Sequence, residues 1–101
     1  MTERAVFFLS DQTGVTAETL GHSLLTQFNR QHFRQVTLPF IDSEDKAREA
    51  VRTINAASEK DVVKPIVFST LVQPELRTIV KSANGLHLDI FDAFLQQLSS
   101  E

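Results

Sequence analysis

The chain has 101 residues, a length that fits one domain and is too short for two ordinary ones. Its hydrophobic fraction of 42% is enough to fill one core, and its formal net charge of -3 gives no basic excess that would favour nucleic acid or an anionic membrane surface. Cysteine is absent, which excludes disulfides and cysteine-ligated metal. No apolar run approaches the roughly 20 residues of a membrane helix, so we expect a cytoplasmic protein.

The first strand–helix unit opens the chain. Ala5–Leu9 is a continuous apolar run that ends at turn residues, which is typical of a strand buried on both faces of a parallel sheet. The segment that follows has apolar residues at helical spacing. Its predicted stripe is Val15, Leu20, Leu24 and Phe28, with Ala17, Gly21 and Leu25 beside it.

A second unit follows the first. A strand is predicted at Val36–Ile41, and Pro39 within it favours the edge of a sheet because proline cannot donate a ladder hydrogen bond. Asp42 or Ser43 can cap the next helix, whose first turn carries acidic residues that suit the helix dipole. The predicted inner face of this helix is Ala47, Ala50, Val51, Ile54 and Ala57.

The remaining sequence predicts two further strands and two further helices. Pro65–Phe68 is a third strand, and Pro74 suits the first turn of the helix after it. The inner face of that helix is predicted to be Leu76, Ile79, Val80 and Ala83. Leu86–Ile90 alternates like a short fourth strand. A last helical stripe comprises Ile90, Phe91, Phe94, Leu95 and Leu98.

Strands that alternate with helices at this spacing predict an α/β fold. We expect one domain over residues 1–101, built on a small, doubly wound, mainly parallel four-stranded sheet with helices on both faces, Rossmann-like or flavodoxin-like. In such sheets ligands bind beyond the carboxyl ends of the strands. Three junctions lie there: Ser10–Thr16, Asp42–Ser43 and Ser69–Gln73.

The first junction is the richest in functional groups. Its ligand-binding candidates are Ser10, Asp11, Thr13, Gly14 and Thr16, and Asp11 and Thr13 are also its catalytic candidates. A helix N-terminus offers unpaired N–H groups to an anion, glycine allows close backbone approach, and hydroxyls can donate to phosphate oxygens. Asp11 and Glu18 would repel phosphate unless a cation intervenes. In the structural alternative, Thr13 or Thr16 caps the helix, Glu18 complements its dipole and Asp11 closes the turn.

The other polar groups give weaker signals. Ser69 and Thr70 are ligand-binding candidates whose hydroxyls could face the same crevice, or ordinary turn residues. The histidines (His22, His32 and His87) have no partners at metal-ligand spacing, so no metal site is predicted. The three glycines form no dinucleotide fingerprint, and none begins a phosphate-binding loop with lysine.

The first turn also carries a family resemblance. Val6–His22 resembles the opening of the phosphoenolpyruvate synthase regulatory proteins, relatives of the pyruvate, phosphate dikinase regulatory proteins. Three later segments resemble the same family in the same order: Thr37–Phe40, Pro65–Ser69 and Gln73–Arg77. Gln12 departs from the pattern, in which a small residue follows the Ser-Asp pair.

The resemblance implies a bifunctional activity for a longer protein. Family members phosphorylate a threonine of their target using ADP, and remove that phosphate using inorganic phosphate, with release of pyrophosphate. The implied partner is phosphoenolpyruvate synthase or pyruvate, phosphate dikinase. The family's phosphate-binding loop lies in the later half of its chain, so the resemblance makes this sequence an N-terminal part. We expect no cofactor within the segment and no catalysis by it alone, and a homodimer is left open.

Other functions fit the same residues. The hydroxyl-rich turn is also similar to a flavin-phosphate loop, although the chain has no Trp or Tyr to stack on a flavin. A receiver module needs an acidic residue at the end of the third strand, where this chain has Ser69 and Thr70. The remaining alternatives are another module that binds a phosphate-bearing ligand and a non-catalytic interaction domain.

Overall fold

The computed structural model of the chain describes residues 4–28, 33–61 and 63–90. Its elements are β1 (Arg4–Leu9), α1 (Val15–Leu25), a 3-10 helix (Thr26–Phe28), β2 (Phe33–Leu38), α2 (Glu44–Lys60), β3 (Ile66–Ser69), α3 (Pro74–Val80) and β4 (Leu86–Asp89). His32 and the predicted last helix beyond Ile90 lie outside the described residues.

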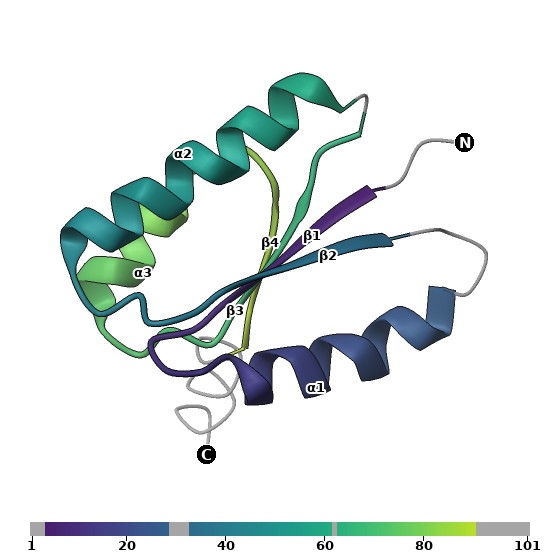
Figure 1. The fold of residues 1–101 in the computed structure, drawn as a ribbon, viewed down its shortest axis with the longest axis horizontal. Helices are drawn as coiled ribbons and strands as arrows, with labels where there is room; N and C mark the ends of the chain where they lie inside the picture. The colour runs from purple at the N-terminus through teal and green to yellow at the C-terminus, as the bar shows by residue number, and fades with distance from the viewer. Residues whose placement is uncertain (1–3, 29–32, 62, 91–101) are drawn as a thin grey trace, which may run out of the picture.

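The four strands form one parallel sheet in the order β2-β1-β3-β4. The helix α1 covers one face of this sheet, and α2 and α3 lie together against the other (Figure 1). This arrangement confirms the predicted α/β fold with a doubly wound, four-stranded sheet. It arises because the chain leaves β1 toward β2 and then crosses back to β3, and right-handed crossovers in opposite directions place their helices on opposite faces.

Two apolar clusters sit on the two faces of the sheet. Along β1, alternate residues enter alternate clusters: Ala5, Phe7 and Leu9 pack with α2 and α3, whereas Val6 and Phe8 pack on the α1 side. All five are buried, as expected for a central strand covered on both faces. The predicted inner faces of α2 and α3 are confirmed, since each predicted residue is in or against the first cluster, although Ala83 joins it from beyond the end of α3.

The predicted centre of the apolar stripe of α1 is wrong, and the residues predicted beside it, Ala17, Gly21 and Leu25, face the sheet instead. Ala17 and Gly21 are the buried residues of this helix, whereas Val15, Leu20 and Leu24 are exposed. The cause is the close approach of α1 to the sheet, because a Cβ added at Gly21 would overlap the ring of Phe8. Only the smallest side chains fit between the helix and this ring, and among the larger ones Leu25, one turn further on, packs against the same cluster.

Strand boundaries also differ from the prediction. The second strand is Phe33–Leu38 rather than Val36–Ile41, and it lies at the edge of the sheet as predicted. It ends before Pro39, which has no N–H to donate, and Phe40 has a positive φ of 58° that no strand residue adopts. The third strand likewise begins after Pro65 and runs on to Ser69, and the fourth ends at Asp89.

Candidate functional site

The carboxyl ends of all four strands lie at one edge of the sheet because the strands are parallel. The central pair, β1 and β3, leads into helices on opposite faces, which makes the gap between their ends the topological switch point. Thr70 ties the two ends together, since its backbone N and its Oγ1 donate to the carbonyl oxygen of Leu9 at 3.1 and 3.3 Å. The Ser10 and Ser69–Thr70 junctions are therefore adjacent, as the sequence predicted.

The loop after β1 is also joined to the loop after β2. The amide of Ser10 donates to the Leu38 carbonyl at 3.2 Å, and the amide of Ile41 donates to the Ser10 carbonyl at 2.9 Å. Phe40 N–H donates to the carbonyl of Gln12 at 2.8 Å. These three backbone bonds continue the sheet pairing past the ends of the strands and fix the path of the polar turn.

The two serines at this edge are turned inward. Ser10 and Ser69 are only 6% and 5% exposed. Each hydroxyl accepts a hydrogen bond within its own turn, Ser10 Oγ from Gln12 N–H at 3.0 Å and Ser69 Oγ from Leu71 N–H at 3.2 Å. This is the local side-chain-to-backbone bonding by which serine shapes turns.

The helix α1 begins without a side-chain cap. Its N-cap residue is Gly14, with φ 91°, and no side chain accepts a capping hydrogen bond there. Thr13 Oγ1 lies 3.5 Å from the amide of Val15, and Thr16 is already inside the first turn. Neither threonine is the N-cap residue, although Thr13 Oγ1 accepts a long hydrogen bond from the first amide of the helix, that of Val15. Both threonines are exposed, and Asp11 is half-buried beside them.

Glu18 and Thr37 form a contact that the sequence did not predict. The carboxylate of Glu18, in the first turn of α1, accepts a hydrogen bond from Thr37 Oγ1 on β2. The Cγ2 methyl of Thr37 would lie 2.7 Å from a Cβ added at Gly14. Of the two carboxylates in the turn, Glu18 is thus engaged by β2, and Asp11 is left as the acidic group beside the exposed hydroxyls.

Phe40 is the second residue at this edge that the sequence did not single out. It is 52% exposed and has a left-handed backbone conformation, which is uncommon for an aromatic residue. Its amide and that of Ile41 are held by the loop after β1, so this conformation is imposed by the surrounding bonds. The sequence places Phe40 in the predicted second strand and in the Thr37–Phe40 run that resembles the family, and neither pattern indicates a left-handed conformation.

The described part of the chain shows neither a grouping of metal ligands nor a membrane-spanning helix. Across residues 4–28, 33–61 and 63–90, no three His, Cys, Asp or Glu side chains are grouped as metal ligands would be. The ring of His22 lies 6.0 Å from that of Phe8, and His87 Nε2 lies 2.8 Å from the Ala83 carbonyl oxygen. Within those residues no helix has the length and apolar character needed to cross a membrane.

Fold and site together define a doubly wound α/β domain with a polar, glycine-capped turn at its switch point. A family model described as kinase/pyrophosphorylase matches residues 6–101, and the chain belongs to this family. Relatives from Pseudomonas putida strain F1 and Alcanivorax borkumensis are 52% and 54% identical over 99 residues. A relative from Herminiimonas arsenicoxydans is 52% identical over 98 residues. All three are named as candidate phosphoenolpyruvate synthase regulatory proteins.

The match covers the chain but only part of these relatives. The aligned region takes in 97–98% of this chain and 34–36% of each relative. The chain therefore spans about a third of the length of the curated relatives that it matches.

Proposed function

We propose that the chain is the amino-terminal part of a bifunctional enzyme, an ADP-dependent serine/threonine kinase and phosphate-dependent pyrophosphorylase. Its target would be phosphoenolpyruvate synthase, or pyruvate, phosphate dikinase, regulated by reversible phosphorylation of a threonine. The observation that carries this proposal is the family match over residues 6–101, together with the names of the relatives. Such an enzyme would work in the cytoplasm.

Within that enzyme, we assign the turn after β1 to the wall of the active-site cleft. The N-cap residue of α1 is a glycine, which has no side chain to accept from the backbone N–H groups of the first turn, and Thr13 and Thr16 lie exposed there. These donors suit the oxygens of a phosphoryl group. The half-buried carboxylate of Asp11 suits the hydroxyl of the target threonine, from which it would accept a hydrogen bond or a proton.

The segment would contribute to the cleft without completing it. No glycine in the sequence begins a phosphate-binding loop with lysine, so the groups that hold ADP and inorganic phosphate would come from the rest of the longer protein. The inward serines, Ser10 and Ser69, would shape the turn rather than touch the ligand.

The test compares the 101-residue chain with a longer protein that contains it, in an assay of phosphate transfer from ADP to a threonine of phosphoenolpyruvate synthase. We expect transfer by the longer protein and none by the segment. In the longer protein, Asp11→Ala should lower the rate about 100-fold if the carboxylate assists proton transfer. Thr13→Ala should lower it about tenfold, the effect of one lost hydrogen bond.

Matched controls lie on α2, away from this edge. Glu59→Ala removes an exposed acid near the end of α2 and Thr53→Ala an exposed hydroxyl in its middle, and both should keep full activity. Full activity of Asp11→Ala and Thr13→Ala would remove the turn from the active site. A longer protein that transfers no phosphate from ADP would overturn the proposed activity itself.

A further inference from the structure

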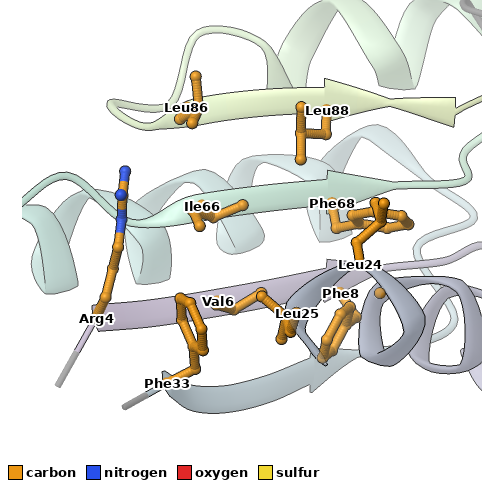
Figure 2. A pocket seen from close by; sticks show the side chains of 11 residues that line it. Arg4, Val6, Phe8, Leu24, Leu25, Phe33, Ile66, Phe68, Leu86 and Leu88 are labelled. Carbon is orange, nitrogen blue, oxygen red and sulfur yellow. The ribbon is translucent and has the colours of Figure 1, made fainter. Parts of the chain in front are cut away.

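Most of the exposed large apolar side chains of the described residues fall into two groups. One group lines an apolar groove of about 440 Å³ on the face of the sheet that α1 covers only in part, as Figure 2 shows: Leu24, Leu86 and Leu88. The other group lies at the carboxyl ends of the strands, with one residue after each of β1, β2 and β3: Val15, Phe40 and Val72. We call these last three residues the edge patch.

The edge patch flanks the polar turn after β1. Neighbouring strands lie about 4.8 Å apart, so the ends of β2 and β3 are about 10 Å apart, with the end of β1 between them. Phe40 N–H donates to the turn at Gln12, and Val72 lies two residues after Thr70, whose amide donates to the end of β1. Val15 is the first residue of α1, directly after the turn. Figure 1 shows the three loops together at this edge.

Phe40 is the most informative member of the edge patch. Its side chain is 52% exposed, and its φ of 58° is a conformation that glycine or asparagine adopts more readily. Neither burial in the core nor backbone preference therefore accounts for an aromatic residue at this position. Strained residues cluster at binding sites, and aromatic side chains supply much of the binding energy between proteins. The ring of Phe40 is thus suited to contact another protein.

The charge of the same edge defines the chemistry of that protein. The strand ends, loops and first helical turns at residues 10–18, 39–46 and 70–76 hold six acidic residues and one basic residue. The basic residue is Lys46, which is paired with Asp42 at 3.1 Å. The three helix N-termini each offset about half a charge, so the edge stays negative. A basic polypeptide is complementary to this edge.

We propose that the edge patch binds the segment of the target protein that carries the acceptor threonine, and that this segment has apolar and basic side chains beside the threonine. This inference rests on the proposed function and adds to it the residues that select the target. With the threonine hydroxyl at Asp11, an extended chain at about 3.3 Å per residue brings its first or second neighbours over Phe40 and Val72. A basic side chain there would also reduce the repulsion between Asp11 and a phosphoryl group.

The test measures the Kd of the longer protein for phosphoenolpyruvate synthase, and the KM for the same enzyme as phosphate acceptor. Phe40→Asn removes the ring but suits the left-handed backbone, so this variant should unfold at the same temperature or higher. Its Kd and KM for phosphoenolpyruvate synthase should rise about tenfold, with kcat and the KM for ADP unchanged.

Matched valines separate the edge patch from apolar surface in general. Val72→Ala should raise the Kd and KM for phosphoenolpyruvate synthase about threefold. Val63, which precedes β3 at the opposite edge of the sheet, is 44% exposed against 47% for Val72, and Val63→Ala should change neither constant.

A second comparison tests the charge of the edge. Glu75 is exposed at the start of α3, and Glu75→Gln should raise the Kd about threefold at low ionic strength. The effect should vanish in about 1 M salt, where the Debye length is about 3 Å. Glu59→Gln, near the far end of α2, should have no effect in either condition.

Several outcomes would overturn the proposal. An unchanged Kd for Phe40→Asn, with a higher KM for ADP or a lower kcat, would assign the edge patch to the nucleotide or to the reaction itself. Unfolding of the longer protein by both Phe40→Asn and Val72→Ala would show that the rest of that protein covers the patch. Because the Kd needs no phosphate transfer, a longer protein that binds through Phe40 and transfers nothing would contradict the proposed activity alone.

Discussion

Gly14 illustrates how one residue can hold the candidate site in place. It ends the turn with a φ of 91°, a conformation that side chains with a Cβ rarely adopt. It also lies against the methyl group of Thr37, whose hydroxyl donates to Glu18. Glycine is therefore favoured at this position for two separate reasons: the left-handed backbone conformation, and the lack of room for a Cβ beside Thr37.

Replacing Gly14 by alanine should lower the free energy of unfolding by about 2 kcal/mol, since a left-handed conformation costs about 1–2 kcal/mol and the contact with Thr37 adds strain. Urea unfolding of the two proteins measures this difference. Adding Thr37→Ser removes the methyl group but keeps the hydroxyl. The double variant should therefore recover only the part of the lost unfolding free energy that is due to crowding against that methyl group. Full recovery would mean that the backbone conformation contributes nothing.

At the scale of elements, α1 and α2 meet the sheet in different ways. The helix α2 has a capping serine, since Ser43 Oγ accepts from the Lys46 amide at 3.3 Å, and a broad apolar face in the core. The helix α1 has a glycine cap and meets the sheet through two small buried residues, Ala17 and Gly21, and the partly buried Leu25. It gains less from packing and is positioned mainly by its closeness to Phe8.

Gly21→Ala sets helix propensity against packing. Alanine favours a helix over glycine by about 1 kcal/mol, whereas overpacking costs about 1–3 kcal/mol. Because the added Cβ would overlap the Phe8 ring, we expect a net loss of stability in thermal or urea unfolding. Combining Gly21→Ala with Phe8→Leu should make the alanine less harmful than it is in the wild-type background. A net gain in stability from Gly21→Ala alone would show that α1 can shift outward at little cost.

At the scale of the whole molecule, the sequence predicted the order of elements and the doubly wound sheet. This was possible because the apolar run of β1 and the helical spacing of apolar residues in α2 and α3 can be recognised from neighbouring residues alone. The contacting face of α1 could not be read in this way. Its apolar residues cover more than one side, and the choice between them depends on the Phe8 ring, which is remote in sequence.

The candidate site was predicted in outline and not in detail. Parallel strands bring the Ser10 and Ser69 junctions to one edge, which requires only the topology. The inward turn of both serines and the bond between Glu18 and Thr37 depend on strand register and on loop path. The strand β2 ends before Pro39, and this boundary determines where Phe40 lies. It too depends on strand register and on the path of the loop.

The backbone bonds between the loops after β1 and β2 have a consequence for amide hydrogen exchange. The amides of Ser10, Phe40 and Ile41 are held by one interlocked set, so they should become accessible to deuterium in a single opening event. Gly14→Ala should speed exchange at all three by the same factor and leave the Asn84 amide, which donates to Asn55 Oδ1, unchanged. Faster exchange at Phe40 and Ile41 with Ser10 still protected would show two loops that open separately, so that a partner could displace one without disturbing the other.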